Sequence, residues 1–196
     1  MQRDAELQRF TDAILAAYRR HTPGIASGAS LGRISEALRT PAPRRRRPGG
    51  RLPVCVHLDA ALAVGTGDDG LGAVIEAFRA IEPALEWQRR AAFDETASAN
   101  FAEGHANAMI LGPGGLESRD DLWLGVSLMA PSVRYTDHAH APEETYLVLS
   151  EGEFQQGDGG WFTPGVGGSF YNPPWIKHAM RSGSTPFFAF WALWVA

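Results

Sequence analysis

The chain of 196 residues is long enough for one domain with a helical extension, and 44% of its residues are hydrophobic, which suffices for a buried core. A formal net charge of −4 and a pI near 5.8 argue against a nucleic-acid-binding protein. The single cysteine, Cys55, excludes an internal disulfide framework and a thiolate cluster for structural zinc. Because its start is charged and no stretch reaches the roughly 20 apolar residues of a membrane span, we expect a soluble, cytoplasmic protein.

The first half of the chain is predicted to be mostly helical. Apolar residues at spacings of three and four predict helices over residues 2–20 and 71–81, and a shorter helix near residues 31–39. Residues 53–64 are apolar, and their periodicity does not decide between a strand and a buried helix. Residues 85–90 either continue the preceding helix beyond a kink or start a strand.

A run of four arginines, residues 44–47, is bracketed by prolines and glycines. These flanking residues predict a loop, and charge runs of this kind are usually solvated. We interpret the run as an exposed connector, with contact to an acidic partner or subunit as the alternative.

Beyond residue 100 the chain is predicted to form short strands. Glycines and prolines separate short runs that are rich in aromatic and β-branched residues, and Gly157-Asp158-Gly159-Gly160 is typical of a hairpin. Close spacing of such runs indicates a sandwich or a small barrel. The predicted strands cover residues 107–111, 122–129, 145–149, 153–156, 160–163, 169–172 and 187–195. We therefore expect a helical extension over residues 1–100 and a β-barrel over residues 101–196.

Three of the six histidines fall in two short segments, His138-Ala-His140-Ala-Pro-Glu-Glu144-Thr-Tyr146 and Asn-Pro-Pro-Trp-Ile-Lys-His178. Because alternate residues of a strand face the same way, His138 and His140 can face a barrel interior together, and so can Glu144 and Tyr146. The stretch between the segments holds the hairpins needed to bring His178 back. Imidazole, carboxylate and phenol groups suit a divalent transition metal. The other histidines lack this context and are interpreted as structural or surface residues: His21, His57 and His105.

The two segments resemble the two motifs of the cupins, small β-barrels that hold one metal ion. The first motif reads His138, His140, Glu144 and Gly152, with the glycine one position later than usual. The second motif reads Gly167, Pro173 and His178, with Trp175 where glycine is usual and Ser182 where asparagine is frequent. The resemblance implies a mainly β fold, a cupin barrel of the jelly-roll type with an N-terminal α-helical extension.

Within the cupins, the first segment and Tyr171-Asn-Pro-Pro-Trp-Ile-Lys-His178 resemble the dimethylsulfoniopropionate (DMSP) lyases of the DddQ and DddL kind. The resemblance covers about residues 120–195 and agrees in general character with the helical first half. It implies a metal-dependent lyase that cleaves DMSP to dimethyl sulfide and acrylate by β-elimination. It also implies one zinc, iron or manganese ion held by His140, Glu144, Tyr146 and His178, with His138 as a further ligand or a close neighbour.

An elimination of this kind needs a base and a place for the sulfonium group. Tyr146 is our first candidate for the base, because a nearby dication favours the phenolate. Tyr135 is the second candidate, as base or as substrate anchor. Aromatic faces would attract the sulfonium by cation–π interaction. The predicted substrate-binding residues are His138, Tyr135, Trp123, Trp175 and Tyr171. Glu143 is expected to point away from Glu144.

Two other kinds of function stay open on the sequence alone. One is a different cupin reaction, such as dioxygenation or isomerisation of another small carboxylic acid. The other is a non-catalytic cupin that binds a small ligand. In each case the expected partner is a small molecule rather than a nucleic acid or a membrane, and a homodimer is compatible with the sequence.

Overall fold

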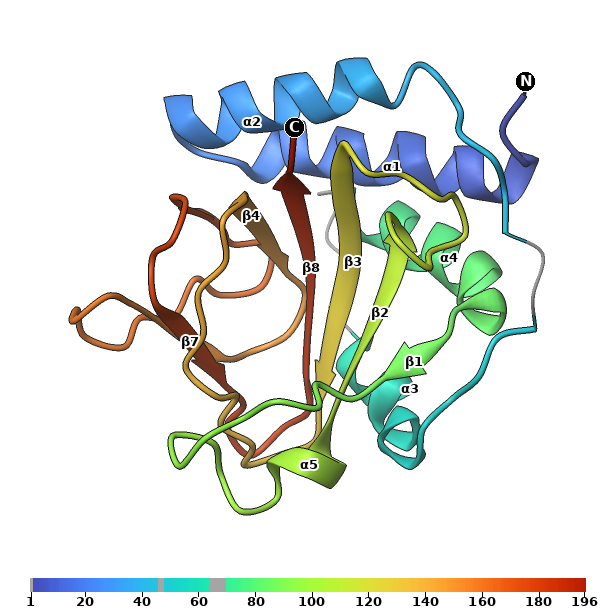
Figure 1. Cartoon of the computed structure of the whole chain (residues 1–196). Helices are drawn as coiled ribbons and strands as arrows, with labels where there is room; N and C mark the ends of the chain where they lie inside the picture. The colour runs from blue at the N-terminus through green and yellow to red at the C-terminus, as the bar shows by residue number, and fades with distance from the viewer. Residues whose placement is uncertain (1, 46–47, 64–69) are drawn as a thin grey trace.

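The computed structural model describes residues 2–45, 48–63 and 70–196, and Figure 1 shows a mainly β molecule with helices along one side. Within these residues no helix is long and apolar enough to cross a membrane. The last two arginines of the predicted loop, Arg46 and Arg47, lie outside the described residues. Arg44 and Arg45 are ion-paired within the chain, each at 2.5 Å, with Asp4 and Glu86 respectively. Arg44 is exposed as predicted, and its ion pair with Asp4 and that of Arg45 with Glu86 fasten the connector to the rest of the chain.

The helices and helical turns are α1 (Ala5–His21), α2 (Ile25–Ala37), η1 (Pro53–His57), α3 (Leu58–Ala61), α4 (Leu71–Ile81), η2 (Glu82–Ala84) and α5 (Phe101–Gly104). The predicted helices over residues 2–20 and 71–81 are confirmed as α1 and α4. Helix α2 starts earlier than predicted, because its first turns carry small residues without an apolar period and follow Gly24, whose φ is 100°. The ambiguous residues 53–64 include η1 and α3 and are therefore helical rather than extended where they are described.

The strands are β1 (Trp87–Gln88), β2 (His105–Leu111), β3 (Leu122–Met129), β4 (Glu143–Val148), β5 (Glu153–Gln156), β6 (Ser169–Asn172), β7 (His178–Arg181) and β8 (Phe187–Trp194). Six of them form an antiparallel sheet in the order β1-β2-β3-β8-β4-β6, and β5 pairs with β7. The predicted strand over residues 160–163 is wrong, because only Phe162 pairs, in an isolated bridge with Phe154 across the predicted hairpin turn. The strand expected to bring back His178 is confirmed as β7, but its bounds were not predicted, because it follows directly on a proline-rich loop.

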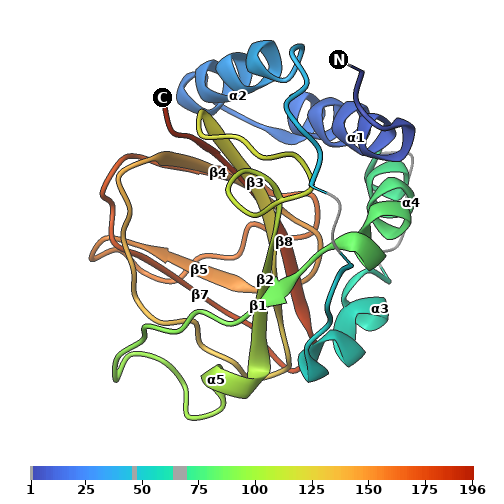
Figure 2. The same ribbon diagram turned by 45° about the vertical axis from the view of Figure 1, so that its right-hand side comes forward.

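The six-stranded sheet is buried on both faces. Helices α1 and α4 lie against one face, and the β5–β7 pair lies on the other side of the sheet, as Figures 1 and 2 show together. The buried residues form two hydrophobic cores, one on each face of the sheet. Along β8, Phe188 and Phe190 belong to the core shared with the helices, whereas Phe187 and Ala189 belong to the core inside the barrel. Phe190, for example, lies 5.7 Å from Phe10 of α1 between ring centroids. Burial on both faces explains why the last strand is apolar at nearly every position.

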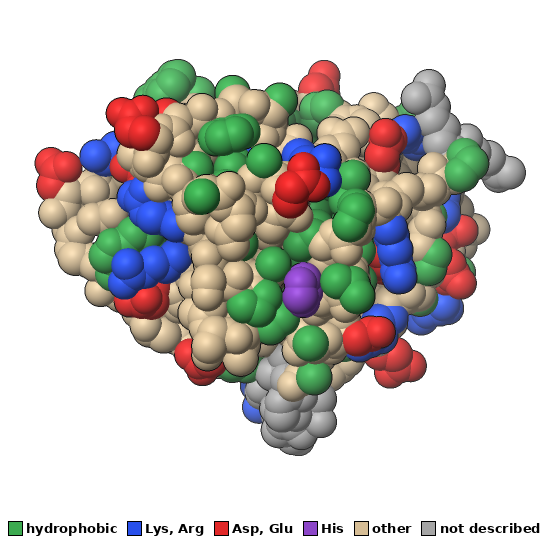
Figure 3. Space-filling view, turned by 90° about the horizontal axis from the view of Figure 1, so that it is seen from below, with side chains coloured by type: hydrophobic (Ala, Val, Ile, Leu, Met, Phe, Trp, Pro, Cys, Tyr) green, Lys and Arg blue, Asp and Glu red, His purple; other side chains and the backbone are tan. Residues whose placement is uncertain are grey.

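These observations confirm the predicted fold class, a small cupin-type β-barrel with helices from the N-terminal half. Strand β1 joins the sheet by pairing with β2, so the segment before residue 100 also supplies an edge strand. On the surface, Figure 3 shows acidic and basic side chains close to one another across the lower face, interspersed with hydrophobic ones. The side chains relevant to function lie inside the barrel, on the face of the sheet turned away from the helices.

Candidate active site

Three histidine side chains meet inside the barrel. His138 and His140 lie on the segment that leads into β4, and His178 is the first residue of β7. The backbones of His138 and His178 pair in both directions, with N···O distances of 3.0 and 2.8 Å. Each histidine has one ring nitrogen that lies within 4.8 Å of a ring nitrogen of each of the other two, so the three side chains could hold a metal ion. The structure thus brings together all three histidines of the two sequence segments.

Each histidine of this cluster has one ring nitrogen engaged by the backbone. Nδ1 of His138, His140 and His178 lies 2.8 to 2.9 Å from a carbonyl oxygen two residues away. Because a carbonyl only accepts, Nδ1 carries the proton in the neutral ring and Nε2 keeps a free lone pair. Metal-binding histidines in proteins commonly have this arrangement. Nε2 of His178 is buried and has no hydrogen-bond partner in the described part of the chain. These donors therefore fit a divalent transition metal.

Glu144 places a carboxylate beside two of the three histidines. Its Oε2 lies 3.3 Å from Nε2 of His178 and 3.5 Å from Nε2 of His140. Four ligands placed about 2.0–2.1 Å from one ion in a tetrahedron would be separated by about 3.3 Å, so these distances suit a shared ion. Asn172, opposite Glu144 on β6, donates to Oε2 at 2.9 Å and fixes its orientation.

The protonation states of Glu144 and His138 also suit a metal, whereas burial lowers the pKa of His140 but its bond to the Glu144 carboxylate outweighs burial and raises that pKa. Burial raises the pKa of Glu144, but His140 and His178 outweigh it and hold that pKa well below its usual range, so the carboxylate stays charged. Burial and the neighbouring His178 lower the pKa of His138 to about 3, so this imidazole stays neutral. Neutral imidazole and ionised carboxylate are the forms in which these side chains bind metals.

Tyr146 lies on the same interior face as Glu144, two residues further along β4, and is buried. Its ring stacks on Phe170 at a centroid distance of 5.1 Å. Burial raises the pKa of Tyr146 well above its usual value, and the adjacent Glu144 carboxylate raises it further. His138 lies with His140 and His178 in the cluster, and the Tyr146 hydroxyl lies beside the Glu144 carboxylate. Tyr146 as a metal ligand stays a prediction.

A cavity of about 210 Å³ adjoins the cluster. Drug-sized ligands occupy pockets of about 300–1,000 Å³, so this cavity suits a smaller molecule. Its walls include several predicted residues: Trp123, Tyr135, His138, His140, Glu144 and Tyr146. They also include residues that we did not predict: Arg90, Asn107, Met109, Ser127, Met180, Trp191 and Leu193. Most of these are alternate residues of β2, β3 and β8, and the residues between them face the helices. The two-residue alternation along each strand could therefore have predicted which side chains line the cavity.

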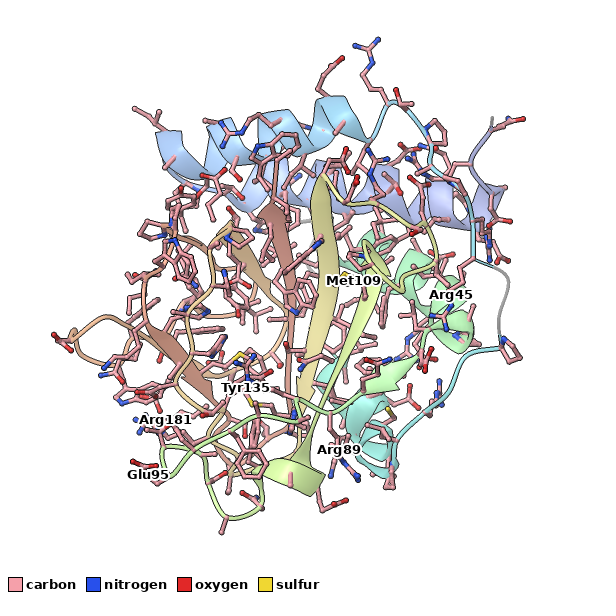
Figure 4. The ribbon with its side chains drawn as sticks, in the orientation of Figure 1. Arg45, Arg89, Glu95, Met109, Tyr135 and Arg181 are labelled. Carbon is pink, nitrogen blue, oxygen red and sulfur yellow. The ribbon has the colours of Figure 1, made fainter. Side chains whose placement is uncertain are left out.

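A second hollow of about 280 Å³ shares Arg90, Asn107, Met109, Tyr135 and Trp191 with the cavity wall. It continues toward a third hollow of about 460 Å³ at the edge of the sheet. Figure 4 shows Met109 beside β2 and Tyr135 lower down, on the side toward β7. Neighbouring hollows thus share wall residues from the candidate site to the edge of the sheet.

Two predicted substrate-binding residues lie away from the cavity. The Trp175 side chain is 69% exposed, in a loop where its backbone φ is 63°. The Tyr171 hydroxyl donates to Glu143 at 2.6 Å, and Glu143 also pairs with Arg33 of α2. Glu143 points away from Glu144, as strand alternation requires. Both residues were predicted because they lie in the second motif. Tyr171 points away from the cavity along β6, and Trp175 lies in an exposed loop.

His105 has a structural role next to the cavity. Its ring stacks on Phe101 at a centroid distance of 3.8 Å, and its Nε2 accepts a hydrogen bond from the Arg90 backbone N–H at 2.8 Å. This bond anchors the backbone from which the Arg90 side chain reaches the cavity.

Comparison with known proteins identifies the family. A family model described as DMSP lyase matches residues 26–189. The chain belongs to the DMSP lyase family. A relative from Cereibacter sphaeroides that carries the name DMSP lyase DddL is 32% identical over 155 residues, which cover 79% of this chain and 62% of the relative. The chain therefore matches less than two thirds of that relative's length.

Solved structures of DMSP lyases have a similar fold. The crystal structure of DddQ from Ruegeria pomeroyi gives a TM-score of 0.74 at 23% identity, covering 98% of this chain and 92% of that one. Crystal structures described for RdDddP and RnDddQII include a chain with a TM-score of 0.73 at 23% identity, with 98% and 93% covered. The family match also includes α2, α3 and α4, so the likeness to DMSP lyases extends beyond the barrel motifs.

Proposed function

We propose that this member of the DMSP lyase family is a metal-dependent enzyme that converts DMSP to dimethyl sulfide and acrylate by β-elimination. The observation that carries the proposal is a cluster of three histidines, with Glu144 3.3 Å from His178, beside a small cavity that is lined by two of these histidines, Glu144 and two tyrosines. Membership of the family supports the substrate.

DMSP carries a carboxylate at one end and a sulfonium at the other. Elimination removes a proton from the carbon beside the carboxylate, which is a weak carbon acid because the carboxylate stabilises the resulting charge poorly. A zinc, iron or manganese ion bound by His138, His140, Glu144 and His178 would supply Lewis-acid chemistry by withdrawing charge from that carboxylate. The cluster thus defines the carboxylate end of the cavity.

Tyr146 is the proposed base, because its phenol lies inside the cavity beside the cluster. The phenolate takes the proton, the released electron pair forms the new carbon–carbon double bond, and the carbon–sulfur bond breaks. The sulfur keeps the bonding pair and leaves as neutral dimethyl sulfide. Glu144 raises the pKa of Tyr146, and positive charge at the cluster acts in the opposite direction. Tyr135 is the alternative base.

The sulfonium end is assigned to the indole rings of Trp123 and Trp191, which line the same cavity. A cation over an aromatic face gains about 0.5–2 kcal/mol. Glu144 is the only acid among the described residues that line the cavity, so no second carboxylate competes for the sulfonium. Two aromatic faces therefore bind the cation without an ion pair that would hinder its departure.

The test compares DMSP with its analogue that lacks one methyl group on sulfur. Purified protein is loaded with zinc, iron or manganese, and volatile sulfur compounds are measured by gas chromatography. We expect dimethyl sulfide from DMSP and no methanethiol from the analogue. The sulfur of the analogue is neutral, so it would have to leave as the methanethiolate anion, which is a poorer leaving group than neutral dimethyl sulfide. Absence of dimethyl sulfide with all three metals, or equal release from both compounds, would contradict the proposal.

A further inference from the structure

Three polar side chains on adjacent strands connect in a line to Tyr135. The Trp191 indole N–H of β8 donates to Ser127 Oγ of β3 at 3.1 Å. Ser127 Oγ lies 2.7 Å from Asn107 Oδ1, and Asn107 Nδ2 lies 2.9 Å from the Tyr135 hydroxyl oxygen. Asn107 and Ser127 are directly opposite each other on β2 and β3, and all four residues line the cavity.

The hydrogen bonds of the structure run along this line in one direction. An indole N–H can only donate, so the Ser127 oxygen accepts from Trp191, and the Ser127 hydroxyl donates to Asn107 Oδ1. The amide NH₂ group of Asn107 faces Tyr135 and donates to its hydroxyl oxygen. The Tyr135 oxygen therefore accepts a hydrogen bond, and the line makes no use of its hydroxyl hydrogen.

Arg90 reinforces this arrangement from the other side. It lines the cavity together with Tyr135, and a guanidinium has only donors. Burial raises the pKa of the Tyr135 hydroxyl, and the donors of Asn107 and Arg90 act in the opposite direction. The hydroxyl hydrogen remains available to an acceptor in the cavity.

The start of the line is held in place by the packing of Trp191. Gly125 lies opposite Trp191 on β3, and a β-carbon at position 125 would come within 2.3 Å of the indole ring. The glycine leaves room for the ring to lie against the sheet. Trp191 is therefore seated by backbone and ring packing as well as by its bond to Ser127.

We propose that Trp191, Ser127 and Asn107 form a positioning relay that aims the Tyr135 hydroxyl at the substrate carboxylate; this inference rests on the proposed function. As the proton leaves the neighbouring carbon, negative charge grows on that carboxylate, so a donor aimed at it binds the transition state more strongly than the ground state. Tyr135 touches the substrate, and the three relay residues act through it.

The test is a double-mutant cycle of Asn107→Asp and Tyr135→Phe. Asp keeps the shape of the side chain and the acceptor for Ser127 but cannot donate to Tyr135. We expect Asn107→Asp to lower kcat by about tenfold or more, less than the 10²–10³-fold reported for outright loss of such a donor, with little change in KM. In the Tyr135→Phe background the same change should have almost no further effect, because the relay acts through that hydroxyl.

Control variants separate the relay from general damage. Gln155→Glu makes the same amide-to-acid change on β5, where the side chain donates to the Gly159 carbonyl outside the cavity, and should leave kcat unchanged. Ser127→Ala should lower kcat as Asn107→Asp does, and Ser127→Thr, which keeps the hydroxyl, should restore it. Metal content and melting temperature are measured for each variant, so that kcat refers to folded, loaded protein.

Two results would overturn the relay: an unchanged kcat for Asn107→Asp, or an equal loss of kcat in the presence and absence of the Tyr135 hydroxyl. If the unmodified protein does not cleave DMSP, the proposed function fails and the same cycle is measured by calorimetry with acrylate as the probe. In that case Asn107→Asp should weaken acrylate binding only when Tyr135 is present. Additive weakening, or none, would then reject the relay by itself.

Discussion

His138, His140 and His178 each engage Nδ1 with a backbone carbonyl and direct Nε2 to a common centre. The backbone therefore fixes the tautomer before any ion arrives. The bridge between His138 and His178 joins the two sequence motifs through the backbone, so their side chains keep a fixed separation. A change at one of these positions should affect metal binding more than folding.

The first prediction concerns His178→Ala. We expect purified protein to retain about one divalent ion per chain and the variant to lose nearly all of it, because Ala removes the buried Nε2 that would bind the ion. Metal content is measured by mass spectrometry after dialysis, with His57→Ala as a matched histidine substitution away from the cluster. Full metal content in His178→Ala would reject the assigned ligand set.

The second prediction separates the two tyrosines of the cavity. Tyr146→Phe should reduce kcat by about 10²-fold or more, because it removes the proposed base, whereas metal content should not change. Tyr135→Phe should keep part of the activity, since it removes a hydrogen-bond donor and not the base. Initial rates at equal metal loading decide between them. The reverse order of effects would assign the base to Tyr135.

At the level of elements, buried ion pairs connect the helices to the barrel. Arg3, just before α1, pairs with Glu117 at 2.7 Å, and Glu117 also pairs with Arg119 at 3.0 Å. Arg3 and Arg119 also donate to backbone carbonyls at the end of α2, Leu38 and Ala37. All three charged side chains are almost fully buried, so Arg3 depends on Glu117 for compensation, whereas Arg119 also pairs with Asp121 at 2.6 Å.

The third prediction follows from this network. Glu117→Ala should lower the free energy of unfolding by about 3–5 kcal/mol, because it leaves two guanidinium groups buried without their shared carboxylate. Glu36→Ala breaks an exposed pair with Arg39 and should cost less than about 1 kcal/mol. Urea unfolding measures both, and equal effects would contradict a structural role for the buried network.

The fourth prediction concerns acid. Burial raises the pKa of Glu117, but bonds from Arg3 and Arg119 outweigh it and leave the pKa below its usual value of 4.5. A carboxyl whose pKa is lowered by folding contributes stability above its unfolded pKa and loses that contribution as pH falls through its folded pKa. The difference in unfolding free energy between the unmodified protein and Glu117→Gln should therefore be constant at neutral pH and shrink below pH 4.5. A difference in unfolding free energy that grows as pH falls would contradict a lowered pKa of Glu117 in the folded protein.

At the scale of the whole molecule, the features that depend on local sequence patterns could be predicted, whereas those that depend on contacts between distant segments could not. Helix α4 was predictable because its apolar residues repeat on one face, and the cluster of His138, His140 and Glu144 because its spacing carries a metal-binding chemistry. Asn107 and Ser127 were missed, because their meaning depends on which strands lie side by side. Trp175 was misplaced, because motif position does not fix the direction of a side chain in a loop.

Helices cover one face of the sheet, and the other face encloses the candidate site of this member of the DMSP lyase family. We propose that the cavity beside the histidines carries out β-elimination of DMSP. Proton NMR of metal-loaded protein and DMSP in one sealed tube tests this proposal. We expect dimethyl sulfide and acrylate in equal amounts, and neither product after chelation of the metal. Formation of 3-hydroxypropionate in place of acrylate, or no reaction with zinc, iron or manganese, would contradict it.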